Sequence, residues 1–247
     1  SLDGAPFASC TSPQHVFVPN DGSHTFEVRQ KTIAGTPGSS AIYNWTVDNT
    51  PPGAPEISQG PGSPTNSNEA EIHFNGEPGG TFSCTLSGPG GTQINNCTSP
   101  RNLSGLLEGT HTLSVRQKDV LDNQGPPSTY TWTVDLTDPP APTIESGPPA
   151  LTASRDASVS FTGEAGGSFQ CALDDASFFF CSSPRELTGL EDGEHQLRIR
   201  QIDEAGNAGP AVTRTWTVDG TGPAAPGLSG PASPTASANA QFTFTGE

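Results

Sequence analysis

The chain has 247 residues, of which 29 are Gly and 25 are Pro; only 15% are charged, and the formal net charge is −16. This acidic balance argues against nucleic acid and anionic membrane as partners, because both need a basic surface, and no apolar run approaches the ~18 residues of a membrane helix. The length suits two ordinary domains or one large β domain. Because the sequence has no Met and residues 1–4 do not resemble a signal peptide, we expect a chain that was processed or cut from a longer one.

In chain order, the predicted elements are strands, because apolar and polar residues alternate. The alternation is clearest in 111–117, where Leu113 and Val115 alternate with polar residues, so that one face is buried and the other is wet. No stretch supports a helix of three turns. Short strands separated by Gly, Pro, Asn and Ser turns predict a Greek-key β sandwich of about 85 residues. In the best-defined unit the strands are 70–74, 81–86, 111–117 and 128–134.

A long internal repeat runs through the chain. The three tryptophans, Trp45, Trp132 and Trp216, recur at nearly equal spacing, and each is followed by Thr, Val and Asp. So many coincident positions indicate tandem copies of one domain. The other recurring residues are histidines, arginines, and cysteines that precede a Ser-Pro step: His24, His111, His195, Arg29, Arg116, Arg200, Cys10, Cys97 and Cys181.

The phase of the repeat predicts the domain organisation. Residues 52–138 and 139–222 are two complete copies, 1–51 is the C-terminal part of a copy, and 223–247 holds the first two strands of a further one. The chain therefore reads as a three-period window on an array, less one short loop and strand start. Proline-rich phrases at the copy boundaries predict stiff linkers: 51–55, 139–142 and 223–226.

The five cysteines fit this layout, although an odd number normally indicates a free thiol. Cys84 pairs naturally with Cys97 and Cys171 with Cys181, whereas the partner of Cys10 is expected immediately before Ser1. Each bridge would close a small loop and stabilise its domain by roughly 2–3 kcal/mol. Disulfides imply an oxidising, extracellular setting. Buried reduced thiols are the alternative; zinc is excluded because there is no C-x-x-C spacing and no accompanying pair of histidines.

The repeated phrases resemble the bacterial Ig-like tandem repeats of large secreted and cell-surface, adhesin-like proteins. The resemblance covers the whole chain. The first copy departs from it, because residues 31–36 lie where the third copy has the phrase D-x-A-G-N, residues 203–207. It implies an all-β chain of tandem Ig-like Greek-key β sandwiches joined by Pro-rich linkers and used as a spacer, stalk or adhesive module. The third copy carries the phrases most fully: Phe169, Cys171, Leu173, Asp174, Cys181, Ser183, Pro184, Gly193, His195, Arg200, Asp203, 205–207 and 216–219.

The recurring polar residues have a structural interpretation and a functional one. His24, His111 and His195 each lie beside a turn Gly, which favours a structural hydrogen bond at a strand start over catalysis. No Ser or Cys nucleophile with a supporting acid recurs around them, so we expect no enzyme. The three recurring arginines are expected to pair with acids or to cap a sheet face.

Calcium is the best candidate metal, because the resemblance implies repeats that can hold Ca²⁺ between domains with oxygen ligands. Ordinary solvated turn acids are the alternative interpretation, and no other cofactor is expected. The candidate ligands are Asp203, Asn207 and Asp219 in the third copy, Asp119, Asp122 and Asp135 in the second, and Asp48 in the first.

One apolar run breaks the pattern. Phe178 aligns with Phe7 and Ile94 and is therefore expected in the core, whereas Phe179 and Phe180 align with small or polar residues. Since neighbouring side chains of a strand point to opposite sides, at least one of this pair is a candidate for exposure and for contact with a partner. Packing against the next domain is the alternative.

Two function classes remain. The first is a non-catalytic structural array on the bacterial cell surface, a segment or subunit of a filament whose partners are copies of itself, joined head to tail by strand addition, or adjoining repeats of one continuous chain. The second is an adhesive module that binds a glycan or a cell-surface ligand through Phe179 and Phe180. An enzyme would require a residue constellation present in one copy alone, and the sequence contains none.

Overall fold

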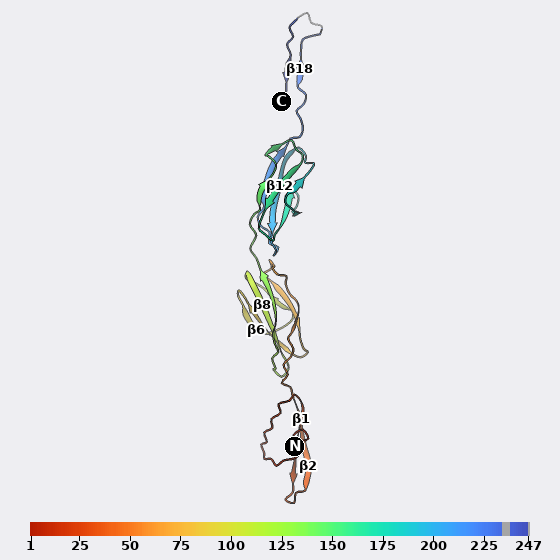
Figure 1. Ribbon diagram of the computed structural model, residues 1–247, viewed down its shortest axis with the longest axis vertical. Coiled ribbons are helices and arrows are strands. Elements are labelled where there is room, and N and C mark those ends of the chain that lie inside the picture. Colours follow the sequence, from red (N-terminus) through yellow and green to blue (C-terminus); the bar gives the residue numbers. More distant parts are fainter. Residues whose placement is uncertain (234–237, 247) are drawn as a thin grey trace. The chain divides into compact units, whose positions relative to one another are not determined.

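A computed structural model describes residues 1–233 and 238–246 (Figure 1). These residues form strands and loops without a helix, so no helix of the described chain is suited to cross a membrane. The chain divides into two compact units, residues 1–63 with 67–134, and residues 64–66 with those from 135 onward. We call residues 1–51 the head and residues from 223 onward the tail.

The head is built on one long hairpin. Strands β1 (Gly22–Lys31) and β2 (Pro37–Val47) pair antiparallel, with His24 opposite Trp45. The segment before β1 contains no strand, and Leu2 forms a single antiparallel bridge to Phe26.

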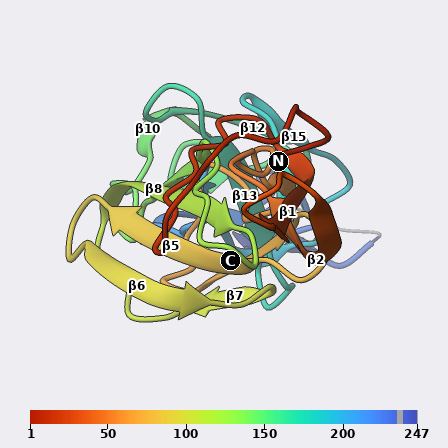
Figure 2. The same cartoon turned by 90° about the horizontal axis from the view of Figure 1, so that it is seen from below.

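The first sandwich contains strands β3 to β9 in two sheets. One sheet has the order β3-β4-β7 and the other β6-β5-β8-β9, and Figure 2 shows β5 beside β8 with β6 at the edge. All pairs are antiparallel. The strands are β3 (Glu56–Gln59), β4 (Ala70–Asn75), β5 (Thr81–Ser87), β6 (Thr92–Cys97), β7 (Arg101–Leu103), β8 (Gly109–Lys118) and β9 (Ser128–Val134).

The second sandwich repeats this plan. Its sheets have the orders β10-β12-β15 and β11-β17-β16-β13-β14, and β11 pairs parallel to β17. The strands are β10 (Thr143–Ser146), β11 (Leu151–Thr152), β12 (Ala157–Thr162), β13 (Ser168–Leu173), β14 (Phe179–Cys181), β15 (Arg185–Leu187), β16 (Gly193–Ile202) and β17 (Val212–Val218).

The order in which the chain visits the two sheets is that of an Ig-like Greek-key sandwich. In the first sandwich two strands enter the smaller sheet, two enter the larger one, the chain returns for one short strand, and the last two finish the larger sheet; the second sandwich adds β11 to the larger sheet between β10 and β12. The predicted all-β fold class is confirmed, as are the four strands predicted in the best-defined unit. The alternation analysis did not identify β3, β6 and β7.

Each sandwich has its own core of side chains that alternate inward along the strands. Trp132 and Trp216 are buried at its centre, and Phe74 and Phe161 each make an edge-to-face contact with a second phenyl ring. Their rings fill the space between the sheets. The structure joins Cys84 to Cys97 across β5 and β6, and Cys171 to Cys181 across β13 and β14, with Cα–Cα distances of 5.9 and 5.8 Å.

The tail forms a two-stranded pair. Strand β18 (Gly227–Ser229) lies antiparallel to β19 (Thr243–Thr245), with Leu228 opposite Phe244. The same pairing occurs between Ile57 and Phe74 in the first sandwich, so the tail has the register of the opening strands of a domain.

Candidate load-bearing site

A loop near the end of each sandwich holds the linker that leads into that sandwich. In the second sandwich, Asp203 Oδ1 accepts hydrogen bonds from the backbone N–H groups of Gly206 (2.7 Å) and Asn207 (2.8 Å). The Asn207 amide then donates to Asp203 Oδ2 (2.8 Å) and to the carbonyl of Asp135 (2.9 Å). The loop is thus hydrogen-bonded to the last residue of the second W-T-V-D phrase.

The first sandwich repeats this arrangement. Asp119 Oδ1 accepts from the backbone N–H groups of Leu121 and Asn123, and the Asn123 amide donates to Asp119 Oδ2 (2.8 Å) and to the carbonyl of Asp48 (2.9 Å). Burial alone would raise the pKa of Asp119, but the donors of Asn123 and Leu121 outweigh it and hold the pKa below its ordinary value. The carboxylate is therefore ionised, and its oxygens accept hydrogen bonds from donors within the turn.

A glycine lies against the backbone carbonyl of each linker proline. A Cβ at Gly125 would lie 2.4 Å from the carbonyl oxygen of Pro52, and a Cβ at Gly209 would lie 2.3 Å from that of Pro139. Both prolines are buried. Only glycine permits so close an approach of the two backbones. The G-P phrases 125–126 and 209–210 therefore help to hold the linker against the sandwich.

Hydrogen bonds join the opening segment of each sandwich to its last strand, and in the second sandwich the two segments, β11 and β17, run parallel. In the second sandwich the N–H of Thr217 donates to the carbonyl of Ala150 and the N–H of Asp219 to that of Thr152, both at 2.9 Å. In the first sandwich the N–H of Thr133 donates to the Ser63 hydroxyl at 3.0 Å. Tension applied at the two ends of such a pair acts along the strands, so the bonds are sheared together.

A buried amide closes the turn after the second strand of each domain. Gln117 and Gln201 are 0% exposed. Gln201 Oε1 accepts from the N–H of Glu164 (3.0 Å) and its Nε2 donates to the Glu164 carbonyl (2.9 Å); Gln117 makes the same two bonds to Glu77. The sequence analysis did not assign this role, although the R-Q phrase recurs in every copy.

The Ser-Pro step after each bridged cysteine also ties the two sheets together. The Ser99 hydroxyl accepts from the N–H of Phe74 at 2.9 Å, and the Ser183 hydroxyl accepts from that of Phe161 at 2.8 Å. Both serines precede a cis proline. This contact too was missed, because the motif carries no sign of its distant partner.

The recurring histidines link a strand start to neighbouring loops. His195 Nε2 contacts the carbonyl of Glu191 (2.9 Å) and Nδ1 contacts Asp174 (3.0 Å). The Glu191 carbonyl and the Asp174 carboxylate raise the pKa of His195, against a smaller opposing effect of burial. His24 has the same pair of contacts, with Asp3 and Asn20.

His111 differs from the other two histidines. Ser87 occupies the position of the acid that faces His24 and His195. His111 Nε2 contacts the Leu107 carbonyl at 2.7 Å, and Nδ1 is buried with no hydrogen-bond partner in the described part of the chain. The three rings lie against the three tryptophans, with centroids 5.6–5.8 Å apart.

The candidate calcium ligands do not gather at one point. Asp203, Asn207 and Asp119 are used in the turns described above, Asp135 contributes a carbonyl to the Asn207 amide, and Asp122 forms an exposed ion pair with Lys118 (3.3 Å). Asp48 accepts from the N–H of Thr50 (3.0 Å). Asp219 donates its N–H to Thr152. Among the described residues no group of three His, Cys, Asp or Glu side chains is arranged to hold a metal ion.

The recurring arginines were expected to pair with acids or to cap a sheet face, and the partners that the structure gives them are neutral. Arg200 donates twice to Gln170 Oε1 (2.9 and 2.7 Å) and lies 4.3 Å from the Phe178 ring. Arg116 donates to the Gly125 carbonyl, and Arg29 covers Phe7.

The phenylalanine run lies at the edge of the larger sheet. Phe178, expected in the core, is half-buried beneath Arg200 and outside the core cluster, because the chain reaches the edge there. Phe179 is 41% exposed near Arg185, and Phe180 is 68% exposed. Cys10, the unpaired equivalent of Cys97, is also exposed.

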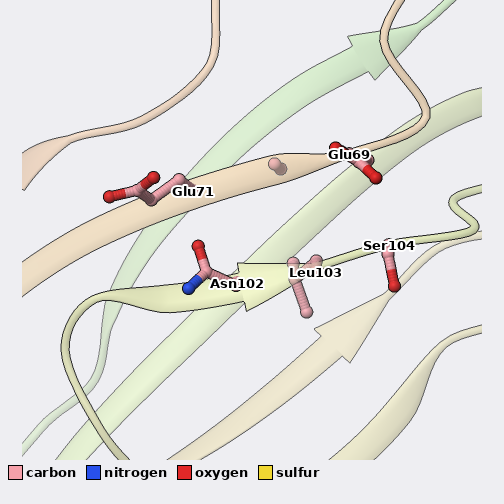
Figure 3. Close-up of a pocket in the computed structure, with 6 residues that line it drawn as sticks. Glu69, Glu71, Asn102, Leu103 and Ser104 are labelled. Carbon is pink, nitrogen blue, oxygen red and sulfur yellow. The ribbon is translucent and has the colours of Figure 1, made fainter.

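A shallow hollow of about 320 Å³ lies on the smaller sheet of the first sandwich. Figure 3 shows Glu71 and Asn102 on neighbouring strands, with Glu69 and Ser104 farther along. Its lining residues include no nucleophile beside a base, so the hollow offers no catalytic arrangement.

No protein-family model matches the sequence, and no curated protein matches it. Two solved structures are similar to parts of the chain at low identity. The FN1–FN3 domains of chicken CNTN1 share 14% identity over 79% of this chain and 75% of that chain, with a TM-score of 0.44. The fibronectin(III)-like modules of Clostridium thermocellum CbhA share 14% over 66% of this chain and 93% of that chain, with a TM-score of 0.43. By its own strand topology the chain is a tandem array of Ig-like sandwiches, and its two disulfides indicate an extracellular setting.

Proposed function

We propose that the chain is a tension-bearing, non-catalytic segment of a fibre on a bacterial cell surface. The observation that carries this proposal is the fastening of each linker to the sandwich that follows it, by Asn123 to Asp48 and by Asn207 to Asp135. A flexible tether would need no such contact. A fibre that transmits force does, because otherwise its joints stretch first.

The disulfides support the same function. Each closes a loop between neighbouring strands, of 13 residues in the first sandwich and 10 in the second. When a domain is pulled open, these residues cannot extend. In the second sandwich the parallel contact between β11 and β17 adds resistance before opening, because its hydrogen bonds are sheared together.

Single-molecule pulling of the full chain tests the proposal. At ~3.5 Å per extended residue, opening the loops adds about 40 Å to the unfolded length of the first sandwich and about 30 Å to that of the second after reduction. We expect two unfolding events that lengthen by these amounts in reductant. Unfolding at forces no higher than those of domains without a parallel terminal contact would contradict the proposal.

A specific observation favours a second candidate, an adhesive module. Phe179 and Phe180 are exposed on β14 of the second sandwich, where the first sandwich has no phenylalanine. Exposed aromatic rings at a sheet edge are suited to stack on a sugar or on an apolar protein surface. Glycan-array binding by the full chain that is lost in Phe180→Ser would support this candidate, and unchanged binding would exclude these rings as the contact.

A further inference from the structure

The outer face of the larger sheet in the second sandwich combines aromatic and cationic side chains. The buried residues of β16 alternate with Arg198 and Arg200, which are half-buried and therefore project from the face that does not line the core. The strand register places Gln170 of β13 between Arg200 and Phe180 of β14. We call these four residues, with Phe178 just before β14, the Arg-Phe face.

Neutral partners hold both guanidinium groups of this face in place. Arg200 donates through Nε and Nη2 to Gln170 Oε1, and Nη2 of Arg198 donates to two backbone carbonyls of the turn 174–176, both at 3.1 Å. The Phe178 ring lies 4.3 Å from the guanidinium carbon of Arg200 and 5.3 Å from that of Arg198. The Nη1 group of each arginine donates to no described residue, so both keep N–H donors for a ligand.

No acid neutralises these two arginines within the described part of the chain. The sequence has 26 acidic residues against 10 Lys and Arg, yet no described carboxylate oxygen lies within 4.0 Å of Arg198 or Arg200. A planar guanidinium with free N–H donors recognises a carboxylate through charge-assisted hydrogen bonds. Because both groups are already ordered, a carboxylate that binds them costs little further side-chain entropy.

The other copies separate the structural part of this face from the part that only the second sandwich has. Arg29 covers Phe7 in the head at 3.7 Å, so a single arginine on a phenyl ring is a feature of the repeat. Arg198 is additional, because its equivalent in the first sandwich is Ser114. Phe180 is additional too, because neither of the other two copies has a phenylalanine at its position.

The Arg-Phe face is packed, and one ring on it is open to solvent. Ala172 lies on the outer face and outside the core cluster, yet it is 0% exposed, whereas its equivalent Thr85 is exposed. The side chains of the Arg-Phe face therefore cover this part of the sheet. Phe180 remains 68% exposed at its edge. A rigid cationic pair thus lies beside an accessible aromatic ring.

We propose that the Arg-Phe face binds an oligosaccharide with a single acidic sugar, such as a uronic acid. Its carboxylate accepts hydrogen bonds from Arg198 and Arg200, and a pyranose ring lies on Phe180. Charge complementarity selects the carboxylate, and the flat phenyl ring offers an apolar surface to the C–H groups of the sugar. This proposal rests on the adhesive function given above as the second candidate, and it names the class of ligand.

The surrounding charges limit the ligand to one acidic group. Glu194 lies on the same outer face of β16, four residues before Arg198 and therefore about 13 Å away along the strand. A hollow of about 350 Å³ lies at that end, lined by Asp174, Asp175, Glu194, His195 and Gln196. These acids repel a second anion but accept hydrogen bonds from sugar hydroxyls. The net charge of −16 also repels polyanions from the chain as a whole.

NMR titration of the full ¹⁵N-labelled chain tests the proposal with a matched pair of ligands. Cellobiouronic acid differs from cellobiose only in carrying a carboxylate in place of one CH₂OH group. We expect cellobiouronic acid to shift the amide signals of β13, β14 and β16, and cellobiose to bind at least ~10-fold more weakly. Binding of the acid should weaken as NaCl is raised from about 50 to about 500 mM.

Two substitutions separate the two halves of the contact. Phe180→Ser removes an exposed ring, so it should weaken binding ~10-fold while leaving Tm and the salt dependence unchanged. Arg198→Ser, which copies Ser114, should remove most of the preference for the acid over cellobiose and flatten the salt dependence. Arg198→Lys keeps the charge without the planar fork, so it should restore the salt dependence but only part of the affinity.

Two matched controls should bind like the parent chain. Arg155→Ser removes an equal charge from an exposed arginine that is paired with an acid elsewhere in the second sandwich. Phe179→Ala removes the neighbouring ring, which lies on the opposite face of β14.

Equal affinity for the two saccharides overturns the proposal, as does binding that is unchanged in both Phe180→Ser and Arg198→Ser. Equally tight binding of a capped Gly-Glu-Gly peptide also overturns it, because that ligand has a carboxylate and no sugar ring. If cellobiose binds as well as the acid and is lost in Phe180→Ser, the adhesive function stands without a preference for acidic sugars. If neither saccharide shifts an amide signal at ~10 mM, the proposal and the adhesive function both fail, and the tension-bearing function is still decided by pulling.

Discussion

Replacing Gln201 with Leu removes a buried amide while nearly conserving its volume. The side chain is 0% exposed and makes two hydrogen bonds to the backbone of Glu164. Each is worth a net ~1 kcal/mol, and because Glu164 itself is exposed, water can reach part of the backbone that loses its partner. We therefore expect a loss of about 2 kcal/mol from the second sandwich.

Scanning calorimetry of the full chain measures this loss. For a domain of this size about 2 kcal/mol corresponds to a fall in Tm of roughly 8–16 °C. Hydrogen exchange read by mass spectrometry assigns the lowered transition to β12 through β17. The matched control is Gln30→Leu, at the same repeat position but exposed in the head, which should leave both transitions unchanged.

A fall of less than ~3 °C in Gln201→Leu would refute the reasoning, because the amide would then contribute less than one net hydrogen bond. A fall in the transition of the first sandwich instead would show that the two domains are not independent.

Three further predictions concern the same contacts. Because the pKa of His195 is raised above 6.5, its value in the unfolded chain, the charged ring stabilises the fold below that pH, and this stability is lost as pH rises through the folded pKa. Asp174→Ser, which copies Ser87 of the first sandwich, should flatten the resulting pH dependence of Tm. An unchanged slope would exclude the His195–Asp174 contact as the source of this dependence. Gly209→Ala places a Cβ against the Pro139 carbonyl and should cost ~1–3 kcal/mol by calorimetry, whereas Gly222→Ala, with open space around it, should cost little; equal effects would contradict the steric argument. Asn207→Ala should speed hydrogen exchange of residues 135–138, since it removes the donor to the Asp135 carbonyl; unchanged exchange would mean that the loop does not hold the linker.

The sequence predicts the fold well where side chains alternate over a long strand. The W-T-V-D phrase and the alternation around Leu113 and Val115 are enough by themselves to indicate half-buried strands. The three strands that were missed in the first sandwich are β3, β6 and β7. Strands β3 and β7 have only four and three residues, too few for a period of two to be recognised. Both strands are formed by pairing with β4, a partner that local sequence does not reveal.

The polar sites are harder to predict, because a residue type does not reveal its partner. Asp203 and Asn207 are equally suited to hold calcium or to build a turn, and only the positions of the backbone N–H groups distinguish the two. Gln201 looks like a surface residue in the sequence, yet it is fully buried. Arg200 was expected either to pair with an acid or to cap a sheet face, and only the structure shows that its neighbour on the adjacent strand is Gln170.

Negative-stain electron microscopy, under non-reducing conditions, of the material that contains this chain tests the central claim most directly. The fibre function predicts long filaments with an axial repeat set by the number of domains in one chain. Discrete short rods that never join end to end would contradict it.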